Sequence, residues 1–524
     1  MMRLKAVLTC AGLLAGAFVA LSPTAAQAAP TRYEAESSPA VCNGTIDSNW
    51  SGYSGSGFCN GNNAVGASAQ FTVNAGAAGT ATLSVRFANG TTTARPADLI
   101  VNGSTVQNVS YEGTGAWDTW VTKTLTVSVR SGSNTIQLNP TTSNGLANID
   151  YIEVDAGGTT PPTGSTLYVA PNGRDGATGT QSDPTTLTSA ITRIAAGGTI
   201  YVRGGTYNFS QTVTIAPGNN GTSSARKKLS AYPGETPILN FSAQSEDPAN
   251  RGLAVNGSYW HIYGIVVERA GDNGIFVGGS NNIFERTVTR FNRDTGLQLS
   301  RIASDTPRDQ WPSNNLVLSA LSHDNADSDG EDADGFAAKL TVGSGNVFRY
   351  CVSRNNIDDG WDLYTKTDTG AIGPVTIEDS LSYNNGTLSD GSQAGNGDRN
   401  GYKLGGEDIA VNHTIRRNIA YRNGKHGFTY NRNPGTMTVS DNVSIDNAER
   451  NYSFDAGTSV FRNNVSCRSG SGTNDRIIGN SDSSNQFWSG SNGSRCSSYS
   501  GALNWSFASD GRLVVTFGGT PVTP

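Results

Sequence analysis

Apolar and polar positions alternate in short segments along the first part of the chain, up to about residue 155. Asn, Gly and Ser, which favour turns, separate these segments. The pattern predicts strands at residues 69–74, 82–88, 99–101, 122–129 and 134–138. Many short strands with turn residues between them are typical of a β-sandwich, here expected to be of the jelly-roll type.

A glycine followed by a large apolar residue recurs later, at Gly296, Gly335, Gly360, Gly401 and Gly427, with a weaker copy at Asn451. An asparagine precedes each copy, at Asn292, Asn325, Asn356, Asn385, Asn423 and Asn447. Such a repeat indicates stacked coils, because one coil cannot bury its apolar face alone. We therefore predict an all-β chain whose second part is a right-handed parallel β-helix, with the asparagines hydrogen-bonded from coil to coil.

An amphipathic pattern at residues 187–194 predicts a short helix ahead of the strands of this second part. The helix would cover the first edge of the β-helix, which otherwise invites pairing with another chain. Residues 157–165 are rich in Gly, Thr and Pro, a composition typical of a linker.

The first residues have the features of a secretory signal. Arg3 and Lys5 precede an apolar run at residues 6–21, and small residues follow. The run is too short for a membrane anchor, so we expect secretion and no membrane association. The expected segments are a signal peptide at 1–28, a β-sandwich at 29–156, a linker at 157–166 and a β-helix at 167–524.

Composition narrows the function classes further. The 64 glycines and the 15% of charged residues fit an extracellular β protein. Separately, we expect the protein to be a monomer. The formal net charge of −6 argues against a nucleic-acid partner. In an oxidising compartment, Cys42 and Cys59 are expected to pair, as are Cys467 and Cys496. Cys351 then remains as a buried free thiol.

Carboxylates gather at two neighbouring copies of the repeat. Asp358, Asp359 and Asp362 lie within five residues, and Asp334 occupies the position of Asp359 one coil earlier. Parallel coils stack about 4.8 Å apart, so Asp334 and Asp359 are predicted neighbours. An acidic turn explains this column poorly, because stacked like charges are unfavourable without a cation. Oxygen ligands without a thiolate favour Ca²⁺.

Lys403 occupies the position of Asp362 one coil later, beside the predicted cation. A divalent cation lowers the pKa of a neighbouring lysine, and a base must be neutral to accept a proton. Lys339 is a rival on the same face, and we favour Lys403 because its column places it next to Asp362 and the predicted cation. The asparagine-to-glycine offset lengthens only in the coils of Asp334 and Lys403, where long loops can build the walls of a cleft.

Three motifs, at residues 333–340, 358–362 and 401–406, resemble polysaccharide lyase family 9, the β-helical pectate lyases, over about residues 167–454. The resemblance implies a calcium site at Asp334, Asp358, Asp359 and Asp362 and a catalytic base at Lys403. It also implies β-elimination on polygalacturonate, in which Lys403 takes the C5 proton and 4,5-unsaturated oligogalacturonides are released.

The first part resembles family 35 carbohydrate-binding modules, through residues 33–36, 115–120 and 148–152. The resemblance implies a structural calcium bound by Glu34, Glu36 and Asp150 and retention on plant cell wall. We expect Trp117 to stack on a sugar ring and Asn148 to bond sugar hydroxyls.

Other functions remain open from sequence. Asp358 and Asp359 can serve as the acid and base of a β-helical polygalacturonase, with His426 nearby. A lyase of this family can act on another acidic glycan, such as rhamnogalacturonan. An adhesin would use calcium only to hold its coils together.

Overall fold

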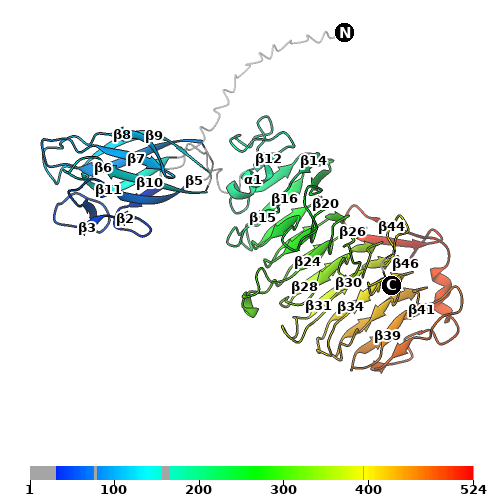
Figure 1. Ribbon diagram of the computed structural model, residues 1–524. Helices are drawn as coiled ribbons and strands as arrows, with labels where there is room; N and C mark the ends of the chain where they lie inside the picture. Colours follow the sequence, from blue (N-terminus) through cyan, green and yellow to red (C-terminus); the bar gives the residue numbers. More distant parts are fainter. Residues whose placement is uncertain (1–30, 76–78, 131, 156–165, 394, 523–524) are drawn as a thin grey trace, which may run out of the picture. The chain divides into compact units, whose positions relative to one another are not determined.

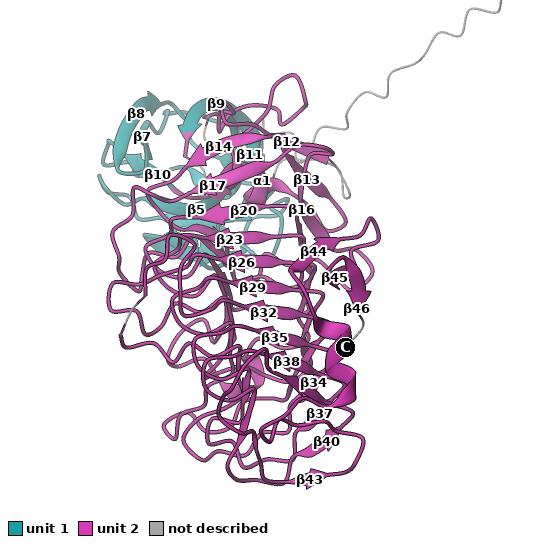
Figure 2. Cartoon of the chain, turned by 90° about the vertical axis from the view of Figure 1, so that its right-hand side faces the viewer, with its two compact units in different colours: residues 1–73, 80–128, 135–160 teal, residues 74–79, 129–134, 161–524 magenta. Residues whose placement is uncertain are grey.

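The computed structural model describes residues 31–75, 79–130, 132–155, 166–393 and 395–522. The chain forms two compact units (Figure 2). Unit 1 comprises residues 1–73, 80–128 and 135–160, and unit 2 comprises residues 74–79, 129–134 and 161–524. The predicted signal peptide and linker residues 157–165 lie outside the described residues. Within the described ranges, no helix is long and apolar enough to cross a bilayer.

Unit 1 is a β-sandwich of antiparallel sheets. One sheet has the order β3 (Gly44–Asp47), β4 (Phe58–Gly61), β11 (Asn148–Asp155), β6 (Gly79–Ala88), β9 (Val121–Val129), with β1 (Thr31–Glu34) on β11. The other has the order β2 (Val41–Cys42), β5 (Ala69–Ala75), β10 (Gly132–Pro140), β7 (Ala97–Val101), β8 (Ser104–Val109). The five predicted strands are present as β5, β6, β7, β9 and β10. A disulfide joins Cys42 on one sheet to Cys59 on the other.

Unit 2 is a right-handed β-helix of parallel sheets (Figure 1). The first sheet has the order β12 (Thr166–Val169), β13 (Thr199–Val202), β16 (Lys227–Ala231), β19 (Trp260–Tyr263), β22 (Ile283–Glu285), β25 (Leu316–Leu318), β28 (Asn346–Arg349), β31 (Val375–Glu378), β34 (Thr414–Arg416), β37 (Thr438–Ser440), β40 (Val460–Arg462), β43 (Asn480–Ser481). The second has the order β14 (Gly205–Asn208), β17 (Pro237–Asn240), β20 (Val266–Glu268), β23 (Val288–Arg290), β26 (Leu321–His323), β29 (Val352–Arg354), β32 (Leu381–Tyr383), β35 (Ile419–Tyr421), β38 (Val443–Ile445), β41 (Val465–Cys467). The third has the order β15 (Val213–Ile215), β18 (Leu253–Val255), β21 (Ile275–Val277), β24 (Leu297–Leu299), β27 (Phe336–Ala338), β30 (Trp361–Asp362), β33 (Tyr402–Lys403), β36 (Phe428–Thr429), β39 (Tyr452–Phe454), β42 (Arg476–Ile477).

The large apolar residues of the repeat point inward and stack in the core of unit 2. The stack runs through Phe336, Trp361, Tyr402, Phe428 and Tyr452, with successive ring centroids 4.9, 4.9, 4.6 and 5.1 Å apart. Each ring is buried. Burying a large apolar side chain contributes about 1.5–3 kcal/mol, so this stack fixes the register of the third sheet.

The predicted asparagine ladder is present and explains the repeated glycine. Asn356 Nδ2 donates to Asn385 Oδ1 at 2.9 Å, and the bonds continue through the other ladder residues. A Cβ at Gly360 would lie 2.1 Å from Ser382 Oγ and 2.9 Å from Asn385 Nδ2. A second set of stacked asparagines, which the sequence did not reveal, includes Asn282, Asn315 and Asn346, and Asn418, Asn442, Asn464 and Asn485.

The predicted helix is α1 (Leu187–Arg193), which begins where Thr186 Oγ1 accepts a hydrogen bond from Ser189 N. Its buried residues Leu187 and Ile191 join the core of unit 2 beside β12 and β13. The helix therefore covers the first coils, as the sequence predicted.

The residues after β43 form an antiparallel sheet on the outside of the β-helix. This sheet contains β44 (Leu503–Phe507), β45 (Leu513–Phe517) and β46 (Thr520–Val522). Val515 and Phe517 share a core cluster with residues of the second parallel sheet, Val352, Leu381, Ile419 and Val443. Trp505 Nε1 donates to Tyr383 Oη at 2.9 Å. The C-terminal segment thus braces the second sheet.

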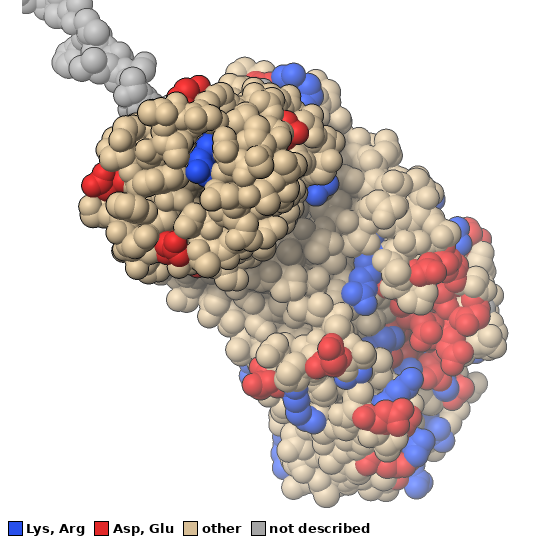
Figure 3. Space-filling view, turned by 60° about the vertical axis from the view of Figure 1, so that its left-hand side comes forward, with Lys and Arg blue, Asp and Glu red and all other residues tan. Residues whose placement is uncertain are grey.

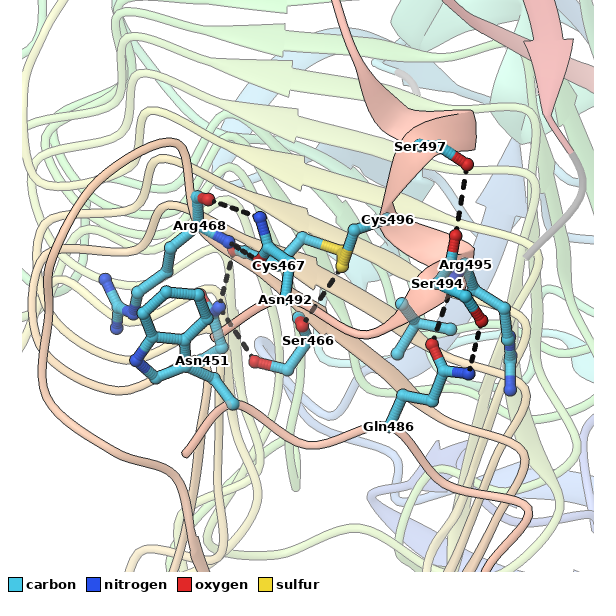
Figure 4. The surroundings of a disulfide bond; sticks show 12 residues. Asn451, Ser466, Cys467, Arg468, Gln486, Asn492, Ser494, Arg495, Cys496 and Ser497 are labelled. Atoms are coloured by element: carbon cyan, nitrogen blue, oxygen red, sulfur yellow. Dashed lines mark hydrogen bonds between the residues drawn. A yellow bond between two sulfur atoms is a disulfide. The ribbon is translucent and has the colours of Figure 1, made fainter. Parts of the chain in front are cut away.

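A disulfide between Cys467 and Cys496 fastens this segment to β41 (Figure 4). Beside it, Asn492 Nδ2 donates to Arg468 O at 2.8 Å, and Asn451 Nδ2 donates to Cys467 O at 2.9 Å. The asparagine ladder therefore ends at the disulfide. Cys351 is a buried free thiol.

Candidate functional site

The third parallel sheet places the predicted site residues in neighbouring coils. Ala337 pairs with Asp362, and Asp362 pairs with Lys403. Asp334 and Asp359 also lie in adjacent coils, since Gly335 N donates to Asp359 O at 3.0 Å. All five predicted residues are buried.

A close group of carboxylates forms at the start of these strands. Asp334, Asp358 and Asp359 each offer an oxygen, and these oxygens lie within 4.8 Å of one another. Asp362 lies outside this close group and instead faces lysines. The structure thus brings together three of the four predicted metal ligands and places the fourth beside them.

Lys403 lies among carboxylates, with its side chain 11% exposed. Its Nζ lies 3.1 Å from Asp398 Oδ2, 3.3 Å from Asp359 Oδ2 and 3.6 Å from Asp362 Oδ2. Burial lowers the pKa of Lys403, but the charges of Asp362 and Asp359 outweigh burial and raise that pKa above its ordinary value. In the absence of a cation, the protein therefore holds Lys403 as an ammonium.

Lys339, the rival base, is also buried at the site. Its Nζ donates to Asp334 Oδ2 at 2.8 Å and to Asp362 Oδ2 at 3.4 Å. Burial lowers its pKa, and the charges of Asp334 and Asp362 raise it well above the ordinary value. Asp362 thus lies between the two lysines.

Hydrogen bonds orient the three close carboxylates. Asp334 Oδ1 accepts from Asp359 N at 3.2 Å, and Asp359 Oδ1 accepts from Asn400 N at 2.6 Å. Asp358 Oδ1 accepts from Arg399 N at 3.1 Å and from Asp398 N. The second oxygens of Asp334 and Asp359 face Lys339 and Lys403, respectively.

Two buried carboxylate oxygens, Asp359 Oδ2 and Asp362 Oδ1, have no hydrogen-bond partner. Burial raises the pKa of Asp359 to about 6, and it raises the pKa values of Asp334 and Asp358 well above the ordinary value. Unbalanced buried carboxylates are costly, and a hard cation with oxygen ligands relieves that cost. The donor set therefore fits Ca²⁺.

A cavity of about 320 Å³ opens onto the site. Its lining includes Lys339, Asp358, Asp362 and Lys403 together with residues that the sequence did not single out: Glu331, Asp332, Leu340, Tyr364, Lys366, Asn396 and Asp398. The rival acid–base partner His426 is not among its lining residues. In the space-filling view, carboxylate side chains gather in one area of unit 2, with Lys and Arg beside them (Figure 3).

Asp398 is the functional candidate that sequence reasoning missed most clearly. It lies on the lengthened loop before Gly401, and its Oδ1 accepts from Lys425 Nζ at 3.0 Å while its Oδ2 faces Lys403. Asn396 Nδ2 on the same loop donates to Asp329 O at 3.2 Å, which joins the two long loops beside the cavity. The longer spacing between Asn385 and Gly401 was the feature of the sequence that pointed to this loop.

The predicted calcium ligands of unit 1 converge on the loop around Gly55. Ser54 N donates to Asp150 Oδ1 at 2.9 Å, and Ser54 Oγ donates to Glu34 Oε2 at 2.7 Å. A Cβ at Gly55 would lie 1.9 Å from Glu36 Oε1. Asp150 is also ion-paired with Arg86. Glu36 Oε2 is buried without a hydrogen-bond partner.

The predicted sugar-contact residues of unit 1 differ in their exposure. Trp117 is half-buried, with the guanidinium of Arg95 5.2 Å from its ring centroid. A Cβ at Gly90 would lie 2.4 Å from the Trp117 ring, so only glycine fits beneath it. Asn148, at the start of β11, is only 3% exposed. Trp117 is therefore the more accessible of the two.

Both units of the chain are similar to known proteins. The family model for the Pel9A-like, right handed beta helix region matches residues 167–464, and that for carbohydrate binding module family 6 matches residues 37–156. Pectate lyase L of Paenibacillus polymyxa (strain SC2) is 54% identical over 325 residues, which are 62% of this chain and 72% of that protein. Pectate disaccharide-lyase of Dickeya chrysanthemi is 35% identical over 329 residues, which are 61% of this chain and 40% of that protein.

A solved structure supports the same assignment. The crystal structure of pectate lyase Pel9A aligns with a TM-score of 0.55 and 32% identity, covering 62% of this chain and 80% of that chain. The chain belongs to the Pel9A-like family of right-handed β-helix proteins, polysaccharide lyase family 9, and is a polysaccharide lyase with an N-terminal carbohydrate-binding module.

Proposed function

We propose that this protein is a secreted, calcium-dependent pectate lyase that cleaves polygalacturonate by β-elimination. The observation that carries the proposal is the buried group of Asp334, Asp358 and Asp359 beside Lys403. The pectate lyases to which the chain is similar support the choice of substrate.

The proposed calcium ligands are Asp334, Asp358, Asp359 and Asp362. Asp359 Oδ2 and Asp362 Oδ1 accept no hydrogen bond, and this supports the set, because a buried carboxylate oxygen without a donor is costly unless a cation lies against it. When bound, calcium would withdraw charge from the carboxylate of the reacting uronate and so acidify its C5 proton.

Lys403 is the proposed base. In its neutral form, its Nζ takes the C5 proton, and the electrons of the C5–H bond form the C4–C5 double bond. The C4–O bond then breaks, and the leaving oxygen takes a proton from water. Lys339 holds Asp334 and Asp362 in place through its ion pairs. The product is a 4,5-unsaturated oligogalacturonide.

The test of this proposal is product analysis on polygalacturonate and on rhamnogalacturonan. Ultraviolet-absorbing ends should accumulate on polygalacturonate, and an excess of chelator should stop their formation. New reducing ends without ultraviolet absorbance would instead indicate a hydrolase. A preference for rhamnogalacturonan would correct the substrate and leave the elimination chemistry standing.

For unit 1 we propose binding to pectic polysaccharide of plant cell wall, through Trp117 and Asn148, with a structural calcium at Glu34, Glu36 and Asp150. The proposed boundaries remain 29–156 for this module and 167–524 for the lyase. The half-exposed ring of Trp117 supports sugar stacking. If the full chain carrying Trp117→Ala is retained on insoluble pectic polymer as well as the wild type, the assignment of Trp117 is wrong.

A further inference from the structure

The segment that follows Asp362 forms part of the cavity wall, and the mechanism above does not use it. Tyr364 and Lys366 line the cavity from this segment, between β30 and β31. The other lysines of the lining, Lys339 and Lys403, are ion-paired with aspartates. Lys366 is exposed, and its charge acts on the neighbouring Glu407, but within the described residues no carboxylate lies within 4.0 Å of its ammonium group. Its ammonium group is therefore available to an anionic ligand.

Tyr364 is held against the backbone of the next coil. A Cβ at Gly406 would lie 2.4 Å from ring atoms Cδ2 and Cε2 of Tyr364, so this close approach requires glycine. The Tyr364 ring also lies toward the base, since Lys403 Nζ is 5.2 Å from its centroid. Tyr364 is half-buried, so part of its ring faces the cavity.

Glu407 fixes both parts of this wall. Its Oε1 accepts from Tyr364 Oη at 3.4 Å, and its Oε2 accepts from Thr367 N at 2.6 Å and from Thr367 Oγ1 at 2.9 Å. Glu407 therefore fastens the aromatic ring and the turn that carries Lys366. Gly406, the last residue of the motif at residues 401–406, thus has a structural role, because it lets the Tyr364 ring pack against the backbone.

We propose that Tyr364 and Lys366 form a sugar subsite beside Lys403, which binds the uronate next to the one that loses its proton. The apolar face of that sugar packs on the Tyr364 ring, and its carboxylate pairs with the Lys366 ammonium. This subsite rests on the proposed function, and it adds two substrate-binding residues to the site.

The test compares Lys366→Met with Lys366→Arg in the full-length protein. Loss of an exposed charge-assisted contact is expected to raise KM for polygalacturonate about 5–10-fold and to leave kcat within about twofold. Lys366→Arg keeps the charge and should restore most of the affinity. Lys228→Met is the matched control, because Lys228 is exposed on β16 and does not line this cavity. An unchanged KM in Lys366→Met would overturn the subsite.

Tyr364 is tested by Tyr364→Phe, which keeps the ring, and Tyr364→Leu, which removes it. The subsite predicts near wild-type KM for the first and a KM raised about fivefold or more for the second. Equal KM values in both variants, with matching thermal melting, would remove Tyr364 from the subsite.

A binding measurement separates this inference from the proposed function. Calorimetry of saturated tri-galacturonate with Lys403→Ala and with Lys403→Ala/Lys366→Met needs no turnover. Weaker binding in the double variant supports the subsite even if the wild type makes no unsaturated product, an outcome that would reject the lyase proposal alone. Equal binding by the two variants rejects the subsite alone.

Discussion

The two candidate calcium sites of this chain both consist of carboxylates, but the positive charge beside those carboxylates differs. In unit 1, Asp150 is ion-paired with Arg86, and Ser54 bonds both Asp150 and Glu34. In unit 2, the carboxylates around Lys339 and Lys403 outnumber these two ammonium groups: Asp334, Asp358, Asp359, Asp362 and Asp398.

The different surroundings of the two sites imply different roles for a bound ion. Asp150 in unit 1 contacts the guanidinium of Arg86 and the loop at Ser54, so an ion bound there would order this loop. The site in unit 2 combines an excess of buried negative charge, a lysine and an adjoining cavity. An ion there can act on a bound anion as well as on the protein.

The largest expected effect is that of Lys403→Ala. Loss of a general base lowers kcat by about 10²–10⁴-fold, whereas Arg86→Ala in unit 1 should leave kcat unchanged. Initial rates of ultraviolet absorbance on polygalacturonate measure both variants. Should Lys339→Ala lose kcat while Lys403→Ala keeps it, the two lysines have been assigned the wrong way round.

The pH dependence of calcium stabilisation sharpens the comparison. The pKa of Asp359 is raised to about 6, so protonation of this carboxyl stabilises the metal-free fold, and that contribution is lost as pH rises from about 4 through about 6. The raised pKa values of Lys339 and Lys403 contribute stability that is fully present below the ordinary lysine pKa and is lost only as pH rises above it, so they do not change between pH 4 and 7.

Calcium should therefore raise the melting temperature of the protein more at pH 7 than at pH 4.5. Thermal melting with calcium and with chelator at the two pH values measures this difference. Asp359→Asn should reduce this difference, because the amide does not titrate, whereas Asp334 and Asp358 still do. A shift of equal size at both pH values would mean that calcium does not replace protons at these carboxylates.

Asp150→Asn should have the smallest effect on catalysis. The substitution removes the buried carboxylate that pairs with Arg86 and that would bind the expected ion of unit 1, and it should lower the stability by about 1–3 kcal/mol. The kcat on soluble polygalacturonate should remain within about twofold of the wild type. A large loss of kcat would show that the two sites are not independent.

The coil register made much of the site predictable from sequence. The glycine and aromatic repeat set the columns, and these place Asp362 beside Lys403 and Asp334 beside Asp359. The register of the coils could be read from the sequence, because the aromatic stack and the asparagine ladder allow only one alignment of neighbouring coils. The inward direction of Trp361 followed from strand alternation.

The loops were not predictable in the same way. The position of Asp398 depends on a long loop whose described residues, 386–393 and 395–399, are held by distant contacts such as Ser389 N to Asp324 Oδ1 at 2.7 Å. The role of Tyr364 depends on Gly406, which lies in the next coil. The C-terminal sheet packs outside the repeat, and the sequence offered no periodic signal for it.

Crystals soaked in calcium or a lanthanide, with the ions located by anomalous scattering, test the central claim most directly. We expect a peak among Asp334, Asp358 and Asp359, within reach of the cavity that Lys403 lines. An empty position there, with ions only at Glu34, Glu36 and Asp150, would contradict it.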